Sequence, residues 1–517
     1  MQGKRQMFRS SMVVGVLSFL GSLTGILVEI SIASRLGLSK SSDTFYVAFT
    51  LPYILTNLLK ATGQFSLVPF FSSLDLHRSA ADLWHGFSYA ANALFLGMAS
   101  IAGLGALAAP WLIRGLAPGF TRSETVLATE LCRWLFLMVV PAGLTEAIRS
   151  FLLSQHRFAV PASGNFFRNI TVIASILLTF RRLGFYSIVF GYLAGYGVQL
   201  TILLVQLLWL FPVRYSLTLA GSGEPFRNLR GAGAAQLTTA LGWQGLVVVE
   251  RIIASFLPPG TLTALAYGMK IMSTLVEVLA GSLGTAALPT LARAYARHEA
   301  EQVRRALRNV VEIGALTVFP AMVFCLLLPR DIIRLIFERG NFTAQAASLM
   351  ARVFFCYSLS MALYAALRVL NFYLFARNQA AAFMRLAMLQ YGINVALDLL
   401  YVGVFHWQAA GIPLALLTSL VVTAGTAYAQ NVGDLRQSFD KILASYLLKV
   451  TTAASMAALT VWAVALEAPS PTTGITNFLF LCEACGMGLA VFFAVLWVLR
   501  VVKPSQLISL WQRIETP

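Results

Sequence analysis

Two lysines, Lys60 and Lys270, lie inside long apolar stretches of the chain. A charged side chain within such a stretch is costly to bury in a membrane and is by default a functional residue. Two amines facing a common cavity would form a cationic site for an anion such as phosphate, which an ammonium binds as a point charge. Glu277 follows Lys270 by one heptad on the same helical face. We therefore expect Glu277 to pair with Lys270 through water or another residue.

Other charges within apolar stretches have a simpler structural interpretation. Arg149 and Arg368 lie near the expected ends of helices, where a long side chain can reach the polar interface. For Glu29, Glu250 and Arg251, a position at the periplasmic rim of the membrane is the favoured interpretation. The further charges in apolar stretches are Glu146, Arg168, Asp398 and Glu483.

The sequence lacks the motifs of common catalytic sites. It contains no Gly-x-Ser-x-Gly, Walker A or His-Glu-x-x-His pattern. Cys482 and Cys485 form a Cys-x-x-Cys pair, but this pair lies in an apolar stretch without a second pair. We therefore expect no catalytic residue, no metal and no cofactor. Because no dense Lys/Arg run is present, we expect no nucleic-acid partner either.

The composition indicates that a membrane surrounds these residues. Of 517 residues, 58% are hydrophobic and only 11% are charged, whereas a soluble domain carries about 25% charged residues. This excludes a large soluble enzyme, a disordered chain and a disulfide scaffold. Apolar stretches separated by short polar breaks predict an all-α polytopic protein with about fourteen transmembrane helices. The predicted spans are 11–33, 44–71, 86–112, 126–153, 158–180, 184–211, 228–257, 261–293, 305–329, 344–375, 380–404, 409–430, 443–466 and 474–500.

The basic residues predict the orientation of these helices. An even number of spans places both termini on one side, and the loops on that side hold about 20 Lys and Arg against about 9 on the other. The formal net charge of +17 is therefore largely a matter of topology. The positive-inside bias predicts that both termini are cytoplasmic. The basic stretch 330–339 departs from this bias.

An internal repeat relates the two halves of the chain. Segment 29–34 (Glu-Ile-Ser-Ile-Ala-Ser) recurs as 250–255 (Glu-Arg-Ile-Ile-Ala-Ser), and apolar-Pro pairs end the following helices at Pro69 and Pro289. The shift covers an even number of helices, so the copies run in the same direction. Parallel repeats of this kind form two lobes around a site near the membrane midplane. We expect lobes at 1–220 and 221–435, followed by two extra helices and a tail at 436–517.

Several motifs resemble those of a known family. Segment 42–52 (Ser-Asp-Thr-Phe-Tyr-Val-Ala-Phe-Thr-Leu-Pro) and segment 337–343 (Phe-Glu-Arg-Gly-Asn-Phe-Thr) are similar to signatures of the MurJ (MviN) lipid II flippases, as are segments 253–258 and 284–289. The resemblance implies a member of the multidrug and oligosaccharidyl-lipid exporter superfamily. It implies two six-helix lobes around a central cavity, with a groove for a polyprenyl tail at the extra helices. It also accounts for the basic stretch 330–339 as a family loop.

The chain departs from this family at its cavity arginines. The arginine positions of the family's first helix read Ser22 and Val28, its glycine is kept as Gly25, and its aspartate reads Glu29. The arginine pair of the second helix reads Thr56 and Asn57, while Lys60 lies one turn further on and Lys270 replaces the arginine of the eighth helix. The chain thus resembles a divergent member with fewer guanidinium groups for bidentate phosphate binding. The expected substrate-binding residues are Ser22, Glu29, Asp43, Asn57, Lys60, Lys270 and Glu277.

These features predict a flippase for a polyprenyl-diphosphate-linked saccharide, lipid II or a related cell-envelope precursor. We expect it in the bacterial inner membrane, as a monomer working with membrane lipid and a coupling cation, Na⁺ or H⁺. One alternative is a cation-coupled drug or metabolite exporter of the same superfamily, which would need an acidic cavity. Less favoured alternatives are a membrane glycosyltransferase, which would need a longer loop, and a scaffold that does not transport.

Overall fold

The computed structural model describes residues 2–77, 80–221, 226, 234–281, 295, 297, 299–377, 379–430, 441–467 and 474–501. Every regular element within these ranges is a helix. The chain divides into two compact units, Met1–Thr263 and Ala264–Pro517. The predicted all-α fold is confirmed. The predicted lobe bounds 1–220, 221–435 and 436–517 stay a prediction.

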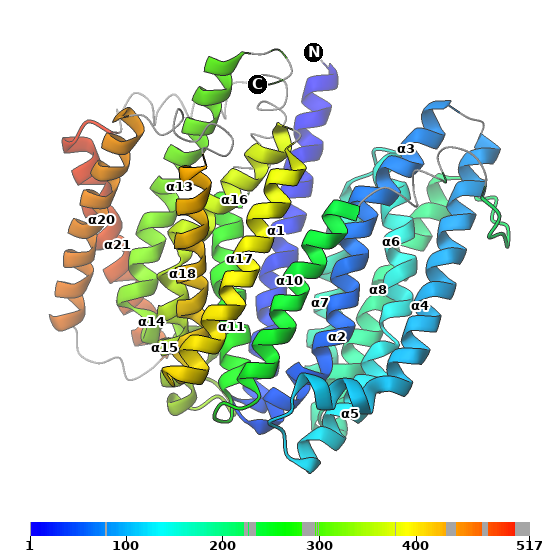
Figure 1. Ribbon diagram of the computed structural model, residues 1–517, viewed down its shortest axis with the longest axis horizontal. Coiled ribbons are helices and arrows are strands. Elements are labelled where there is room, and N and C mark those ends of the chain that lie inside the picture. Colours follow the sequence, from blue (N-terminus) through cyan, green and yellow to red (C-terminus); the bar gives the residue numbers. More distant parts are fainter. Residues whose placement is uncertain are drawn as a thin grey trace. The chain divides into compact units, whose positions relative to one another are not determined.

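The first unit contains the helices up to α10 (Figure 1). A π-helix, η1, continues α2 into α3 without a loop. Within this unit α1 packs along α7, and α7 packs along α8, while α4 contacts α5 and α6. The elements are α1 (Gln2–Leu36), α2 (Lys40–Thr62), η1 (Gly63–Leu67), α3 (Val68–His77), α4 (Ala80–Leu116), α5 (Arg122–Phe136), α6 (Val139–Ser154), α7 (Ala159–Leu183), α8 (Tyr186–Leu210) and α10 (Ala234–Ala254).

The second unit contains nearly all of α11 and every later element. Helices α20 and α21 pack against each other, and both contact α13 (Figure 1). Val450, Ala453, Ala457 and Phe492 are fully buried at this contact. The elements are α11 (Thr261–Val276), η2 (Glu277–Gly281), α13 (Ala300–Leu327), α14 (Pro329–Phe337), α15 (Ala344–Ser358), α16 (Met361–Ala376), α17 (Ala380–Asp398), η3 (Leu399–Val404), α18 (Gln408–Ala429), α20 (Lys441–Glu467) and α21 (Gly474–Val498).

Length and hydropathy make these helices suited to a membrane. In the described ranges, ten helical stretches can cross a bilayer, or up to eleven if the pair Ala344–Ser358 and Met361–Leu374, bent by 48°, counts as one span. Large apolar side chains such as Leu178 and Trp209 are exposed, which is costly in water but favourable in lipid. The predicted polytopic fold is therefore confirmed, and the count of fourteen spans stays a prediction.

Local sequence explains where several helices begin and break. Ser39 caps α2 through a capping box with Ser42, and Thr121 caps α5 in the same way with Glu124. The helix from α2 to α3 passes through the five-residue π-helix η1 at Gly63, a distortion that is frequent at functional sites. This distortion shifts the face that the end of α2 presents to its neighbours.

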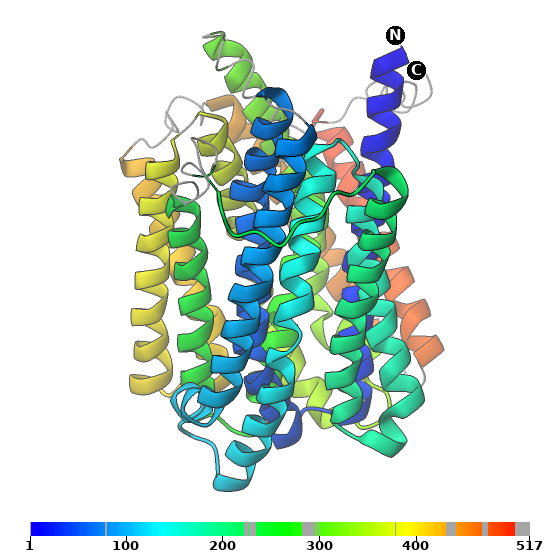
Figure 2. The same cartoon turned by 90° about the vertical axis from the view of Figure 1, so that its right-hand side faces the viewer.

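An aromatic core and an extended segment hold the first unit together at the end of α8. Phe71, Phe87 and Phe151 pack with one another and with Trp84. The extended segment that follows α8 lies on α4 (Figure 2). There the Asn92 amide donates to the carbonyl oxygens of residues 216 and 218, at 3.0 Å each.

Some sequence features lie outside the described residues. These are the predicted family segment 284–289, with the second repeat's proline, and part of the basic loops, including positions 78, 227, 230, 293, 436 and 503.

Candidate functional site

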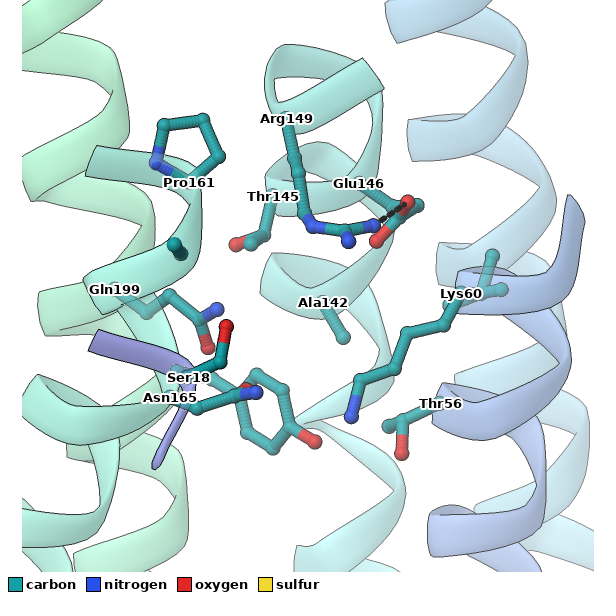
Figure 3. Close-up of a pocket in the computed structure, with 13 residues that line it drawn as sticks. Ser18, Thr56, Lys60, Ala142, Thr145, Glu146, Arg149, Pro161, Asn165 and Gln199 are labelled. Atoms are coloured by element: carbon teal, nitrogen blue, oxygen red, sulfur yellow. Dashed lines mark hydrogen bonds and ion pairs between the residues drawn. The ribbon is translucent and has the colours of Figure 1, made fainter. Parts of the chain in front are cut away.

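A polar cavity lies inside the first unit, between helices that are otherwise largely apolar (Figure 3). Its volume is about 120 Å³, measured for the centres of water-sized spheres. A buried water needs about 10–15 Å³ on this measure, so the cavity holds several waters or a small polar group. It is lined by Ser18, Thr56, Leu59, Lys60, Ala142, Thr145, Glu146, Arg149, Pro161, Ala162, Asn165, Tyr196 and Gln199.

Three charged side chains meet in this cavity. The Arg149 guanidinium donates from Nη1 to Oε1 of Glu146 at 2.8 Å. Lys60 lies close enough to attract the Glu146 carboxylate electrostatically. Figure 3 shows the Lys60 amine and the Arg149 guanidinium pointing into the same space from α2 and α6. The cavity therefore carries two cationic groups and one carboxylate.

The Glu146 carboxylate occupies a position that the backbone of η1 leaves open. Its side chain is almost fully buried, and the Ser150 hydroxyl also donates to Oε1 at 3.4 Å. A Cβ added to Gly63 would overlap this carboxylate. Glycine at position 63 is thus what allows α6 to bring a carboxylate against the end of α2.

Two buried polar atoms that line the cavity have no hydrogen-bond partner among the described residues. They are Thr145 Oγ1 and Gln199 Oε1, on residues that are only 3% and 5% exposed. A Cβ at Gly164 would lie 2.7 Å from Gln199 Nε2, so the glycine on α7 makes room for this amide. Buried polar groups are normally hydrogen-bonded. These two atoms therefore indicate a site for a polar ligand.

Tyr196 closes one side of the cavity. The guanidinium of Arg168 lies 5.0 Å from the centre of the Tyr196 ring, a cation–π contact that holds the ring in place. Within the described part of the chain, no group of three or more His, Cys, Asp or Glu residues could hold a metal ion. The lining of the cavity combines charged side chains with uncharged polar ones.

Lys60 is the predicted site residue that lines this cavity. Thr56, at one of the lost arginine positions, lines it as well. Ser22 and Asn57 are half-buried and do not line the cavity. Ser22 donates to the carbonyl of residue 18 at 3.1 Å. Glu29 accepts a hydrogen bond from the Tyr46 hydroxyl, which ties α1 to α2.

Asp43 makes a second buried polar cluster in the first unit. Its carboxylate accepts the Gly260 N–H at 2.7 Å, the Thr263 N–H at 2.8 Å and the Thr263 hydroxyl at 2.6 Å. The Ser42 and Thr263 hydroxyl groups also lie 3.1 Å apart. These contacts occupy Asp43 in holding segment 260–263, and its predicted role in substrate binding stays a prediction.

Lys270 and Glu277 lie in the second unit. Lys270 is half-buried on α11, and its carbonyl accepts the Ser273 hydroxyl at 3.2 Å. Glu277, the first residue of η2, forms an ion pair with Arg368 on α16. The expected pairing of Glu277 with Lys270 through water or another residue stays a prediction.

A third polar cluster lies between α17 and α18 in the second unit. Asp398 is fully buried and accepts from the Asn394 amide at 3.0 Å. The Ser419 hydroxyl donates to the Asn394 amide oxygen at 3.0 Å. These side chains place several oxygen atoms within one membrane-spanning helix pair.

Sequence reasoning missed most of the cavity. Glu146 was among the charges in apolar stretches, but Arg149 was interpreted as reaching the interface, and the polar residues Thr145, Asn165 and Gln199 gave no signal. The sequence does contain one sign of the charged part of the cavity. Glu146 and Arg149 are three residues apart, a spacing that places a carboxylate and a guanidinium on one helical face.

The fold defines the class of protein. The structure titled "Lipid II flippase MurJ, inward closed conformation" is similar with a TM-score of 0.80 at 17% identity, covering 94% of this chain and 98% of that one. An inward-facing multidrug resistance MATE family transporter of the MOP superfamily is similar with a TM-score of 0.67 at 14% identity, covering 84% and 98%. The chain therefore has the fold of the MOP superfamily transporters.

Sequence comparison narrows this class to one family. The family model described as "Lipid II flippase MurJ" matches residues 32–482. A "Probable lipid II flippase MurJ" of Buchnera aphidicola is 23% identical over 516 residues, covering 93% of this chain and 98% of that protein. A "Lipid II flippase MurJ" of Burkholderia cenocepacia is 26% identical over 372 residues, covering 69% and 70%. The chain belongs to the MurJ family, and the predicted resemblance is confirmed.

Proposed function

We propose that this chain moves a polyprenyl-diphosphate-linked saccharide, lipid II or a related cell-envelope precursor, from the cytoplasmic to the outer leaflet by alternating access. The single observation that carries the proposal is the family match over residues 32–482. The relatives named lipid II flippase support it. A polar cavity with cationic groups, enclosed by apolar helices, supplies the chemistry that an anionic headgroup needs.

Lys60 is the residue proposed to bind the diphosphate in the first unit. An ammonium binds phosphate as a point charge, and Lys60 lines the cavity at the level of Thr56. Lys270 is proposed as the corresponding cation of the second unit. Ser22, Glu29, Asp43, Asn57 and Glu277 complete the proposed set of substrate-binding residues.

The polyprenyl tail stays in lipid beside the last two helices in this proposal. Exposed apolar side chains on α20 and α21, such as Leu459 and Phe478, support a lipid-facing surface there.

The membrane potential favours the proposed direction. A charge that moves across the membrane gains or loses about 2.3 kcal/mol per 100 mV, so export of an anion from a negative interior is favourable. We propose that a cation accompanies the return of the empty carrier. We propose that Asp398 binds it, because a fully buried carboxylate can take up H⁺ or offer its oxygen atoms to Na⁺.

The location and the chemistry follow from the same proposal. The chain would lie in the bacterial inner membrane as a monomer with both termini cytoplasmic, and it would carry its substrate without catalysing a covalent reaction. Multiple membrane-spanning helices support the membrane location. The basic loops support the orientation.

A cation-coupled exporter of a drug or metabolite is the second candidate. The likeness to a MATE transporter fold and the buried Asp398 favour it. This exporter would recognise cationic or neutral compounds at acidic groups, whereas the first unit's cavity carries two cations against one carboxylate. The charge of the cavity therefore favours the flippase.

Reconstitution tests the proposal. Purified protein in vesicles should accelerate movement of labelled lipid II across the bilayer, and Lys60→Gln should slow this movement. Unchanged flipping by Lys60→Gln would remove Lys60 from the site. Equal movement in vesicles with and without protein would contradict the function.

A further inference from the structure

Resting on the proposed function, we propose that Arg149 is the guanidinium that binds the phosphate group of the transported headgroup, and that Glu146 competes with this phosphate for Arg149. Glu146 then acts as a built-in counter-ion that neutralises Arg149 while the cavity is empty. The ligand class is a phosphate ester that carries hydroxyl or amide groups next to the phosphate.

The geometry of Arg149 leaves donors available to a ligand. Its side chain is 30% exposed and gives one N–H, from Nη1, to Glu146 Oε1. A guanidinium has five N–H donors in a planar fork, so the edge not used by Glu146 can bind two phosphate oxygens. Figure 3 shows this group next to Glu146, while the Lys60 amine points toward Thr56 in another part of the same cavity. One fork and one point charge thus line the same cavity.

The position of Glu146 is built into the fold. The carboxylate lies against Gly63 of η1, where a Cβ would overlap it. It forms an ion pair with Arg149 and lies within electrostatic reach of Lys60. A bound phosphate would share these cations with a second negative charge nearby. Removing the charge of Glu146 therefore strengthens anion binding, whereas an ordinary structural ion pair would give no such gain.

The uncharged polar side chains of the cavity indicate which chemical groups the ligand carries next to its phosphate. Thr145 Oγ1 and Gln199 Oε1 are buried and have no partner among the described residues. Gln199 Oε1 accepts hydrogen bonds, and the Thr145 hydroxyl can accept or donate. A sugar phosphate supplies hydroxyl or acetamido donors to both atoms, whereas inorganic phosphate fills the charged end alone.

The site accounts for the guanidinium groups that the chain lacks elsewhere. Ser22, Val28, Thr56 and Asn57 stand at positions where the family resemblance implies arginines. Thr56 lines the same cavity into which Arg149 projects from α6. Arg149 thus supplies a guanidinium to a cavity in which position 56 does not.

Binding to the purified full-length chain in nanodiscs tests this inference. The probes are a short-chain prenyl diphosphate with and without an attached N-acetylhexosamine, with affinity measured by calorimetry. Arg149→Gln should weaken binding of both probes by about 10- to 100-fold, as expected for loss of a charged hydrogen bond. Glu146→Gln should tighten binding of both, and Thr145→Val should weaken binding of the sugar-bearing probe alone.

Matched variants separate binding from folding. Arg133→Gln removes an exposed arginine of the same unit outside the cavity and should bind both probes like the wild type. Arg149→Lys keeps the charge beside Glu146 but removes the fork, so it should bind more weakly than the wild type. Thermal unfolding of each variant measures its folded fraction.

Two results would overturn the inference. One is wild-type affinity in Arg149→Gln. The other is weaker binding in Glu146→Gln, which would show that the pair only supports the structure. The outcome is separable from the proposed function: a chain that binds the probes through Arg149 but does not flip lipid II keeps this inference and loses the function.

Discussion

At the scale of single residues, the two buried carboxylates Glu146 and Asp43 of the first unit have different surroundings. Glu146 forms an ion pair with Arg149 in a cavity that Lys60 also lines. Both carboxylate oxygens of Asp43 accept hydrogen bonds from residues 260 and 263. The first arrangement leaves cationic groups facing open space, whereas in the second both carboxylate oxygens already accept hydrogen bonds. Charge within a helix is therefore a weak guide to function until its partners are known.

Asp43→Asn should destabilise the protein. An amide in place of the carboxylate turns one acceptor oxygen into a donor that faces another N–H, and an unsatisfied buried group costs about 1–3 kcal/mol. Thermal unfolding of the purified protein should show a lower midpoint for Asp43→Asn than for Glu467→Gln, an exposed control on α20. Equal midpoints would contradict the role assigned to Asp43.

The sequence predicted one member of the cavity and missed its partners for a physical reason. Lys60 stands out because a lysine in the middle of an apolar stretch is costly to bury and has no simple structural explanation. Arg149 has one, since a long side chain near a helix end can reach the interface. Only the packing of α6 against α2 shows that Arg149 and Glu146 face Lys60. Thr145 and Gln199 carry no charge, so their types and spacing give no signal.

At the scale of elements, a break in regular helix geometry positions the site. The π-helix η1 joins α2 to α3 and presents Gly63 to Glu146. Averaged hydropathy predicts one continuous apolar stretch at 44–71. It carries no information on the change from α-helical to π-helical hydrogen bonds at η1. The positions of the helices could therefore be predicted from hydropathy, whereas their internal distortions could not.

Gly63→Ala should displace the Glu146 carboxylate from its position and weaken its hold on Arg149. Because the carboxylate is the end of a flexible side chain, the fold should survive this change. Calorimetry should then show tighter binding of prenyl diphosphate, as for Glu146→Gln. Gly97→Ala on α4, where a Cβ meets nothing within 4 Å, is the matched control. Wild-type affinity in Gly63→Ala would contradict the proposal that Gly63 leaves room for the Glu146 carboxylate.

At the scale of the whole molecule, the scarcity of charge and its basic excess have separate causes. The apolar bulk reflects helices that face lipid, as their exposed large side chains show. In the spans predicted from hydropathy, most Lys and Arg residues fall in loops or near helix ends, where basic residues set orientation. A small remainder, including Lys60 and Arg149, faces the cavity of the first unit. The composition alone thus predicted the class of protein but not the location of its site.

The orientation can be tested with single cysteines in a background without the native ones. The basic loops predict that the start of α5 faces the periplasm and the start of α13 faces the cytoplasm. Ser123→Cys and Gln302→Cys, both at exposed positions, should differ in labelling by a membrane-impermeant maleimide. Position 123 should label in spheroplasts and position 302 only after permeabilisation. The reverse pattern would contradict the proposed cytoplasmic termini.

The movement of lipid II across a bilayer tests the central claim most directly. Vesicles containing the purified chain and fluorescent lipid II in both leaflets are treated with a reductant that quenches only the outer leaflet. The wild type should let the quenched fraction rise from about half towards completion, faster than in protein-free vesicles, and Lys60→Gln should slow this rise. A quenched fraction that stays at the protein-free level, with the chain folded and inserted, would contradict the account.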